Sequence, residues 1–571
     1  MLKPKNPTND SFRHFSLWLA ALFLTVLGAK LWVVELYGSP LPLWDQWYEA
    51  ELFLRPWLEG HLTWQTLFAA GNEHRILLTR LLDVGVIDLN GRWEPMVQMV
   101  VNVFLHAGYV CGLAACLWGF WGRKNGWLIC FLLAPFFALP YAAENTIWAI
   151  NSQLYFLAVF SLATLAGLGF NRPGNWRWWL GLAAAVIVLF TMASGLLAPA
   201  AVGGLRTLRA IKNRRMEKSD WITLAACLLI VGLGAALSVE MPGDRALRAH
   251  SVLEFGSALV RNLTWPFFNQ PWMACLMVLP LVILAALYFQ SGFREPRAAE
   301  FLLSFGLWGG LQSVALAYGR ANYGDVIPAS RYMDFLNISV IASLFAAVLL
   351  WQSTVNSRWL NRAGLFALLL FAGVVIWGLC RISEIIVKDF LAPTRMMNLV
   401  AEERVTTLWT TGGTNAFFQP PTVRPSPEVA LGILRDSKLQ TILPAVCLPP
   451  ANPPLAGRFD APGQWLLRNS VIFLYCGLGL FVGLIGYGLV REPSGLAWDS
   501  IPALVAILLL LAALGFVWSK APVQRQTIER DLQYKLADYF KSIGNPERAA
   551  IHEHTAEALA GETNSDAPRR P

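Results

Sequence analysis

The chain has 571 residues, of which 56% are hydrophobic and only 14% are charged, and its formal net charge is +8. A soluble domain has about 25% charged residues. Because the apolar residues also gather into long runs, the composition excludes a soluble multidomain protein and predicts a polytopic membrane protein. The positive charge lies mainly in short loops between these runs, which is typical of cytoplasmic anchoring and not of nucleic-acid binding.

The first apolar run extends from Phe15 to Leu36, close to the 20 or so residues that a spanning helix needs. Lys3, Lys5 and Arg13 precede it, so the positive-inside rule predicts a cytoplasmic N-terminus. The run is long and ends without a small-residue cleavage site. We therefore expect a retained signal anchor and not a cleaved signal peptide.

An acidic and aromatic stretch, residues 43–51 (LWDQWYEAE), follows this span and would face the outside. Aromatic rings favour the headgroup level of a bilayer. A carboxylate held among them is partly shielded from water, keeps a raised basicity and can take a proton from a hydroxyl. Asp45 is the leading candidate for such a base, with Glu49 and Glu51 as secondary candidates. The alternative is that all three are ordinary solvated loop residues.

Residues 37–94 contain no clean span and form a long first external loop. Apolar residues such as Ile76 and Leu77 alternate with basic ones, which predicts helices lying along the membrane interface. Within this loop, the segment Asn72, Glu73, His74 and Arg75 is a candidate site for a phosphate or a sugar. The alternative is an ion pair that caps an interface helix.

Residues 178–205 are apolar but lie between two basic loops, so this stretch must turn back on itself. The expected break is at Ala193, Ser194 and Gly195, with Pro199 nearby. Irregular backbone at that depth is tolerated only where protein or a water-filled cavity covers it, so we expect an internal cavity. The other expected spans are residues 95–121, 127–142, 154–170, 221–239, 273–289, 301–318, 335–351, 365–379, 471–490 and 501–518.

The predicted fold is an all-α bundle of about 11 to 13 transmembrane helices. The transmembrane core covers residues 1–382, a small external subdomain covers 383–469, and the last two spans fall within 470–519. The tail, 520–571, should begin as an amphipathic helix and end disordered from Gly561. The subdomain is rich in proline and lacks cysteine pairs, so it should pack on the outer surface instead of folding alone.

Positive side chains also lie on predicted outer segments, against the positive-inside bias. Arg320 and Arg331, with Tyr332 beside the latter, are the main examples. An arginine fork matches phosphate oxygens, and a lipid-linked phosphate lies at the membrane surface. Alternatively, Arg331 extends toward the interface from the start of a span and Arg320 forms a local ion pair. Glu144, in another outer turn, is a secondary candidate that could instead be solvated.

This layout resembles the GT-C superfamily of integral-membrane glycosyltransferases, which have many spans and a long first external loop with interface helices. The resemblance rests on residues 44–47 (WDQW), 72–75 (NEHR) and 330–332 (SRY). It implies that Asp45 is the catalytic base and that the donor is a polyprenyl-phosphate-linked sugar. The adjacent acid pair of some members is missing, which favours a route without metal. No cofactor is required, although a divalent metal stays possible.

We therefore expect a hexosyl- or pentosyltransferase of the bacterial inner (plasma) membrane. Its partners would be the lipid-linked donor, membrane lipids and a hydroxyl on an envelope glycan, lipid or protein, with no nucleic acid. The first alternative is a flippase or transporter for lipid-linked sugars, which would carry charges within its spans. The sequence disfavours it because its charges are expected to lie in the loops. The second alternative is a non-catalytic envelope-assembly protein, whose outward acids and cations would not converge.

Overall fold

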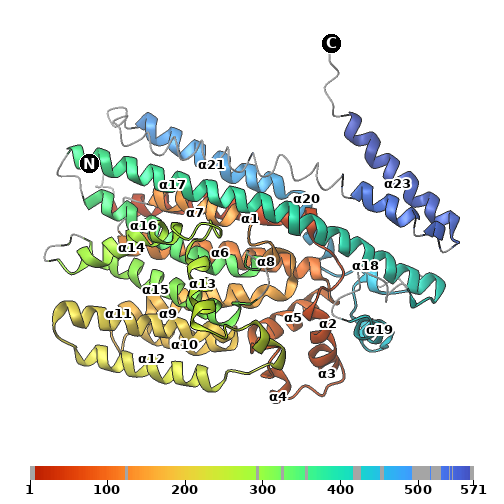
Figure 1. The fold of residues 1–571 in the computed structure, drawn as a ribbon, viewed down its shortest axis with the longest axis horizontal. Helices are drawn as coiled ribbons and strands as arrows, with labels where there is room; N and C mark the ends of the chain where they lie inside the picture. Colours follow the sequence, from red (N-terminus) through yellow and green to blue (C-terminus); the bar gives the residue numbers. More distant parts are fainter. Residues whose placement is uncertain are drawn as a thin grey trace, which may run out of the picture.

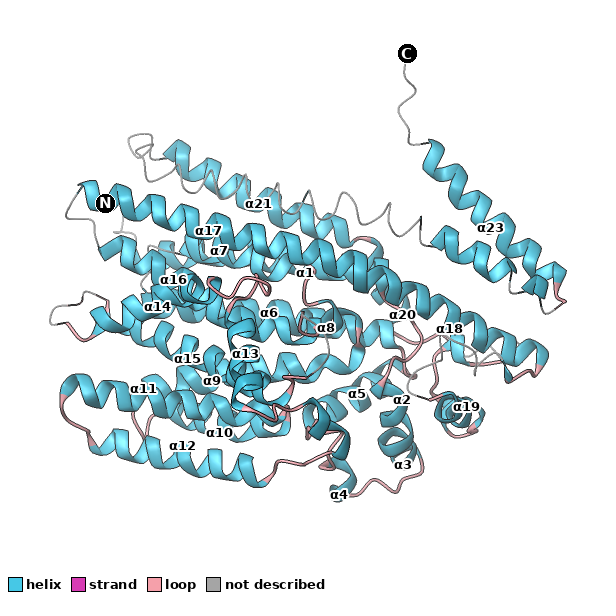
Figure 2. Ribbon diagram, viewed as in Figure 1, coloured by secondary structure: helices cyan, strands magenta, loops and turns pink. Residues whose placement is uncertain are grey.

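The computed structural model describes residues 7–121, 126–290, 295–322, 327–353, 358–415, 426–449 and 456–491, most of 527–565, and the single residues 293 and 515. Throughout this part of the chain the regular structure is helical and no β-strand occurs (Figure 2). The prediction of an all-α fold is confirmed.

Eight helical segments of the described chain are long and apolar enough to cross a membrane, as expected for a polytopic membrane protein. Shorter apolar helices accompany them: α7 (Gly126–Ala138), α10 (Trp176–Ile187) and α14 (Met273–Tyr288). The expected span at 501–518 lies outside the described residues, apart from Gly515. The long segments are built on α1 (Pro7–Tyr37), α6 (Pro95–Trp121), α9 (Ser152–Phe170), α12 (Lys218–Ala236), α15 (Pro296–Gly319), α16 (Met333–Ser353), α17 (Arg358–Ile386) and α21 (Ser470–Arg491).

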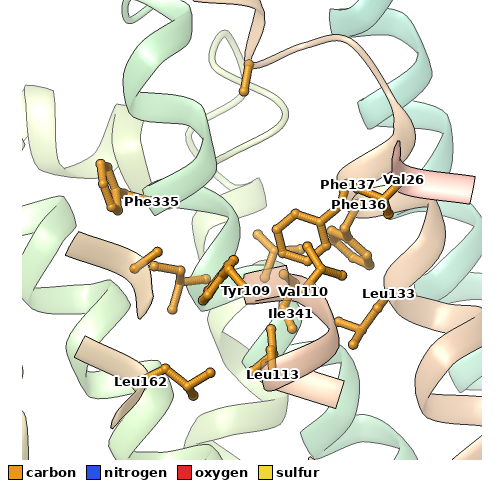
Figure 3. Close-up of a cluster of buried hydrophobic side chains, with 14 of the residues drawn as sticks. Val26, Tyr109, Val110, Leu113, Leu133, Phe136, Phe137, Leu162, Phe335 and Ile341 are labelled. Atoms are coloured by element: carbon orange, nitrogen blue, oxygen red, sulfur yellow. The ribbon is translucent and has the colours of Figure 1, made fainter. Parts of the chain in front are cut away.

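The helices run roughly side by side, and α1 packs against α6, α7 and α21 (Figure 1). Figure 3 shows part of the buried core, a cluster that includes Val26, Val110, Leu133, Phe136 and Ile341. Close approach of α1 to α21 depends on Gly28, where an added Cβ would lie 2.2 Å from the backbone nitrogen of Leu474. Small residues allow such backbone contact between membrane helices.

The first external loop folds into short helices at one end of the bundle. They are α2 (Asp45–Glu49), a π-helical turn at Ala50–Leu54, α3 (Arg55–Leu58), α4 (Trp64–Leu67) and the longer α5 (Leu77–Asn90). Helix α5 buries one face and exposes the other. This agrees with the helices that the alternation of apolar and basic residues predicts for this loop.

The stretch 178–205 is broken as expected. Helix α10 gives way to 3₁₀ turns at Val188–Phe190 and Ala193–Leu196, and α11 (Leu197–Asn213) then returns in the opposite direction. At Gly195 an added Cβ would lie 2.2 Å from the carbonyl oxygen of Val188, so the tight break requires glycine. The proline expected to help break the helix, Pro199, lies in the first turn of α11, where proline is tolerated.

The boundary predicted at residue 382 falls inside a continuous helix. Helix α17 passes through a π-helical turn at Val387–Leu391 into α18 (Ala392–Thr411). The helix ends only at Gly412, which adopts the left-handed conformation with a φ of 70°. The drop in hydropathy after Ser383 therefore marks the end of the apolar part of this helix and not the end of the helix.

Residues 383–469 share a second hydrophobic core with the first external loop. Trp47 and Phe53 of the loop pack in the same cluster as Leu408 of α18 and Leu434 of α19 (Pro427–Arg435). The remaining elements of this region are the 3₁₀ turns Leu439–Thr441 and Ala445–Cys447 and helix α20 (Asp460–Arg468). The subdomain thus closes over α2 and contributes to its position.

The tail contacts α18. Arg548 of α23 (Pro546–Ser565) pairs with Glu403 at 2.8 Å and donates a hydrogen bond to Thr407. Helix α23 continues to Ser565, so the chain is helical beyond Gly561, where disorder was expected. Since helix formation needs no apolar face, the polar composition of 561–565 was a poor guide to its structure.

Candidate functional site

A cavity of about 570 Å³ lies at the end of the bundle where the first external loop meets the ends of the long helices. The predicted site residues that line it are Asp45, Glu49, Glu73, His74, Arg320, Arg331 and Tyr332. They come from α2, the 70–76 loop, the end of α15 and the 3₁₀ turn Ser330–Tyr332 that precedes α16. Residues far apart in the sequence are therefore brought to one hollow.

Asp45 is the first residue of α2 and its carboxylate reaches the cavity. Trp44, before it, has a φ of 51°, a conformation that is uncommon outside glycine. The side-chain amide of Asn72 donates a hydrogen bond to Oδ2 of Asp45 at 3.0 Å. Asn72 also has a positive φ, 54°, which asparagine tolerates better than most residues. Two unusual backbone positions thus hold this contact in place.

The surroundings of Asp45 raise its pKa above the ordinary value. Although the Asp45 side chain is exposed within the cavity, the surrounding protein removes part of its hydration, and this desolvation is the main cause because it disfavours the charged form. The nearby carboxylates of Glu49 and Glu73 act in the same direction. Arg331 and the hydrogen bond from Asn72 oppose the shift. The result is a carboxylate with increased basicity, as expected of a general base.

Glu49 lies at the edge of the cavity but is held by Arg80 of α5. The two side chains form a bidentate pair, with Nε to Oε2 at 2.8 Å and Nη2 to Oε1 at 2.9 Å, and both are buried. Arg80 also donates to the carbonyl oxygens of Thr66, Leu67 and Ala69. This network fixes the loop that carries Asn72, which gives Glu49 a positioning role.

Two predicted site residues are not brought into the cavity. Glu51 is exposed on the π-helical turn after α2 and does not line the hollow. Arg75 donates to the carbonyl oxygens of Phe68, at 2.7 Å, and Leu237, at 3.1 Å. These bonds tie the first loop to the end of α12, so Arg75 does not line either this cavity or the neighbouring chamber.

Glu73 and Arg320 form an ion pair, and Arg320 also contacts Asp244 at 3.3 Å. Burial would raise the pKa of Glu73, but the positive charge of its partner Arg320 opposes this, and the pKa is lowered. For Asp244, burial and the charge of Glu73 prevail, and its pKa is raised. The structure therefore adds Asp244, which sequence reasoning missed, to the charged group around Arg320.

His74 joins the first loop to the break between α10 and α11. Its Nδ1 accepts a hydrogen bond from the backbone nitrogen of Ala193 at 3.3 Å, and its Nε2 lies 3.7 Å from Glu73. Burial lowers the pKa of His74 and favours the neutral ring. With Nδ1 accepting, the neutral ring carries its proton on Nε2, where it faces Glu73.

Arg331 lines the cavity and is oriented by Glu144. Glu144 is buried in the short helix α8 (Ala143–Ile147) and accepts from Nη1 of Arg331 at 2.9 Å. It also accepts from the backbone nitrogen of Arg331 and from the hydroxyl of Ser330. The guanidinium lies 4.9 Å from the ring of Tyr332. Glu144 thus lies behind the cavity as a positioning residue for Arg331.

A second chamber of about 490 Å³ adjoins the cavity. The two hollows share Glu73, His74, Met192, Arg320 and Tyr332. The second chamber is mostly apolar, and its lining includes the helix break at 192–197 together with Leu316, Phe335 and Leu336. A polar cavity containing Asp45 therefore lies directly beside an apolar one.

Buried ionisable residues lie inside membrane-spanning helices of the described chain, contrary to the expectation that charges are confined to loops. Lys30 of α1, His106 of α6 and Asp334 of α16 are all buried in the bundle. The Nζ of Lys30 donates to the carbonyl oxygen of Leu139, and Asp334 accepts from Asn145 at 2.8 Å. The sequence shows that Lys30 lies within the first apolar run, but it does not show that the side chain is buried.

The acids of the cavity are not free to form a metal site. Glu49 and Glu73 both face arginine side chains, so neither offers an unpaired carboxylate beside Asp45. Within the described ranges, no three His, Cys, Asp or Glu side chains are arranged to hold a metal ion.

In comparisons with known proteins, no protein-family model, no curated protein and no solved structure matches the chain.

Proposed function

We propose that this protein is a membrane glycosyltransferase of the GT-C type. It would move a sugar from a polyprenyl-phosphate donor to a hydroxyl on a glycan, lipid or protein acceptor. The observation that carries the proposal is the placement of Asp45, whose pKa is raised, in one cavity with Arg331 and beside an apolar chamber. A base, a phosphate binder and a lipid-compatible space are the three parts such a transfer needs.

In the proposed reaction, Asp45 takes the proton of the acceptor hydroxyl. The hydroxyl oxygen forms a bond to the anomeric carbon of the donor sugar, and the bond from that carbon to the phosphate oxygen breaks. The bonding electrons leave with the polyprenyl phosphate. Attack opposite the leaving group inverts the anomeric carbon.

Arg331 would stabilise the negative charge that develops on the departing phosphate. Glu144 holds one edge of its guanidinium, which fixes the direction of the fork and limits the entropy lost on binding. The Nε2–H of His74 and the hydroxyl of Tyr332 lie on the wall shared with the apolar chamber. These groups could contact the phosphate where the lipid enters.

The apolar chamber would hold the first isoprene units of the donor. Leucine, methionine and phenylalanine side chains make up much of its lining and suit a hydrocarbon chain, because burial of apolar surface favours binding. Charged residues that include Asp244, Arg248 and Arg320 also line the chamber and would face the phosphate end of the donor. Because the chamber adjoins Tyr332 and Arg320, a chain lying in it would place its phosphate near Arg331.

We also propose that the cavity faces the outside of a bacterial inner membrane and that the N-terminus is cytoplasmic. Lys3, Lys5 and Arg13 before the first span support this orientation. The arginine-rich connection between α11 and α12, at the other end of the bundle, agrees with it.

The test is transfer by the purified protein, with polyprenyl-phosphate hexoses and pentoses labelled in the sugar and an envelope extract as acceptor. Asp45→Asn should lower the rate about 10²- to 10⁴-fold, the usual contribution of a general base. Glu51→Gln is the matched control, because this acid lies on the same loop outside the cavity. If the Asp45→Asn variant folded normally and kept full activity, Asp45 would not be the base and the proposed mechanism would be wrong.

Transport of a lipid-linked sugar is a second candidate, favoured by Lys30, His106 and Asp334 within the spans. Intramembrane ionisable residues often form ion or proton pathways. A cavity of about 20 Å³ beside His106 and Asp334 has room for one water molecule. In proteoliposomes, this candidate predicts proton flux with a lipid-linked sugar that is lost in Lys30→Met. A protein that transfers sugar without such flux would rule it out.

A further inference from the structure

A second polar pocket, of about 410 Å³, lies at the opposite end of the bundle from Asp45. The end of α9, the connection between α11 and α12, and the start of α15 enclose it. Its lining contains five arginines and three carboxylates: Arg172, Arg206, Arg209, Arg215, Arg297, Glu217, Asp220 and Glu300. The excess positive charge makes the pocket attractive to an anion.

The distance between the two sites matches a membrane. Helices α9, α11 and α15 have 19, 17 and 24 residues, and each has one end near the Asp45 cavity or its apolar neighbour and the other at the arginine pocket. At 1.5 Å per residue these helices are about 25 to 36 Å long, close to the roughly 30 Å hydrocarbon core of a bilayer. The α11–α12 turn lies at the left of Figure 1 and α2–α5 lie at its right.

The floor of the pocket is preorganised. Arg206 is buried and donates through Nη1 to Asp220 at 2.8 Å and through Nη2 to the carbonyl oxygens of Leu168 and Asn171. Arg209 pairs with Glu300 at 2.7 Å. The Nε of Arg206 is buried without a hydrogen-bond partner, although this residue lines the pocket.

The rim carries exposed charge. Arg172, Arg215 and Arg297 are exposed side chains from three different connections. An anion entering the pocket would therefore meet a positive rim before it reached the buried floor. The positive-inside bias alone explains basic residues within one loop. Here arginines from three separate segments line one pocket, which this bias does not require.

Aromatic side chains mark the level of this pocket in the membrane. Trp176, Trp179 and Trp221 are 57–64% exposed at the first turns of α10 and α12, at the same end of the bundle. Exposed tryptophans favour the headgroup level of a bilayer. A pocket between helix ends at this level lies at the depth of the lipid phosphates. The position of the tryptophans therefore favours a lipid phosphate over a soluble anion.

We propose that this pocket binds the phosphate of an anionic lipid headgroup from the leaflet opposite the Asp45 cavity. Basic pockets between transmembrane helices suit such headgroups because arginine forks match phosphate oxygens. The bound lipid would bridge the three connections and so stabilise the bundle at this end.

The test uses the full-length chain in an uncharged detergent, with phosphatidylglycerol or phosphatidylcholine added. Native mass spectrometry measures the apparent Kd, and thermal unfolding measures the change in Tm. Arg215→Gln with Arg297→Gln removes two exposed rim charges. The matched control, Arg177→Gln with Lys218→Gln, removes two exposed charges from the same end of the bundle outside the pocket.

We expect the rim variant to bind phosphatidylglycerol about tenfold more weakly, since each arginine near the surface contributes to anionic-lipid binding. The control should bind it normally, and phosphatidylcholine binding should not change in either variant. The rise in Tm caused by phosphatidylglycerol should shrink in the rim variant alone. Equal weakening in both variants would overturn the site. An equal rise in Tm with inorganic phosphate would assign the pocket to a soluble anion and overturn the lipid.

Discussion

The side-chain amide of Asn72 donates a hydrogen bond to the carboxylate of Asp45 at 3.0 Å, across 27 residues of sequence. The bond favours the charged form of Asp45 and lowers its pKa, against a larger effect of burial that raises it. Asn72 therefore adjusts the basicity of the proposed base as well as its orientation.

Removal of this hydrogen bond should shift the pH dependence of sugar transfer. The reaction needs ionised Asp45, so kcat/KM should fall as the pH drops through the pKa of Asp45. Asn72→Gly removes the donor but keeps a residue that adopts the positive φ at this position. The pKa should then rise further, and the acid limb of the profile should move to higher pH. A limb that stays in place or moves to lower pH would contradict this role of Asn72.

Arg331→Lys should lower the rate of transfer about 10²-fold, because a lysine cannot reproduce the planar fork that faces a phosphate. Glu144→Gln should have a smaller effect in the same direction, since it loosens Arg331 without removing its charge. Steady-state kinetics with the labelled donor measure both. If Glu144→Gln lowered the rate of transfer more than Arg331→Lys does, Glu144 would have a role that is independent of Arg331.

Arg80→Met should destabilise the protein strongly, because it leaves the buried carboxylate of Glu49 without its partner. Breaking a buried pair by removing one member costs about 3 to 5 kcal/mol. The matched control is Arg245→Gln at the exposed pair with Glu240, which should cost less than about 1 kcal/mol. Thermal unfolding in detergent compares them. Similar Tm values for the two variants would show that the Glu49–Arg80 pair does not hold the first loop.

Gly28→Ala should lower the Tm by separating α1 from α21, because the new Cβ would lie 2.2 Å from the backbone nitrogen of Leu474. Overpacking of this kind costs about 1 to 3 kcal/mol. Gly479→Ala on α21 meets no atom within 4 Å and should leave the Tm unchanged or raise it slightly, since alanine favours helix. A stable Gly28→Ala variant would mean that the two helices can move apart at little cost.

Much of the architecture was predictable because membrane-spanning helices need long apolar runs. The same logic located the break near Gly195, since basic loops on both sides of 178–205 require a turn. Hydropathy failed at Ser383, where it placed a domain boundary within a continuous helix. Polarity reports the environment of a segment and not its secondary structure, and α18 is polar yet helical.

Most of the residues that line the candidate site could be predicted from their types and positions in the sequence. The contacts that each of them makes could not. Asp45 and Arg331 do share a cavity, as outward acids and cations suggested. The sequence could not show that Arg75 lies outside the cavity. Its side chain instead donates to two backbone carbonyl oxygens, and one of these, that of Leu237, is brought close only by the position of α12. Asn72 belonged to the predicted segment 72–75, but no contact between it and Asp45 was predicted. Its contact with Asp45 depends on two positive φ angles that no local pattern reveals.

The uninterrupted helix formed by α17 and α18 is 53 residues long from Trp359 to Thr411. At 1.5 Å per residue it measures about 80 Å, more than twice the hydrocarbon thickness of a bilayer. Its far half carries Leu408 into the same core as Trp47, two residues after Asp45. The two halves of this helix should therefore move together. A small tilt of the membrane-embedded half, for example in a thinner bilayer, would change how Leu408 packs in the core that contains Trp47, next to the proposed base.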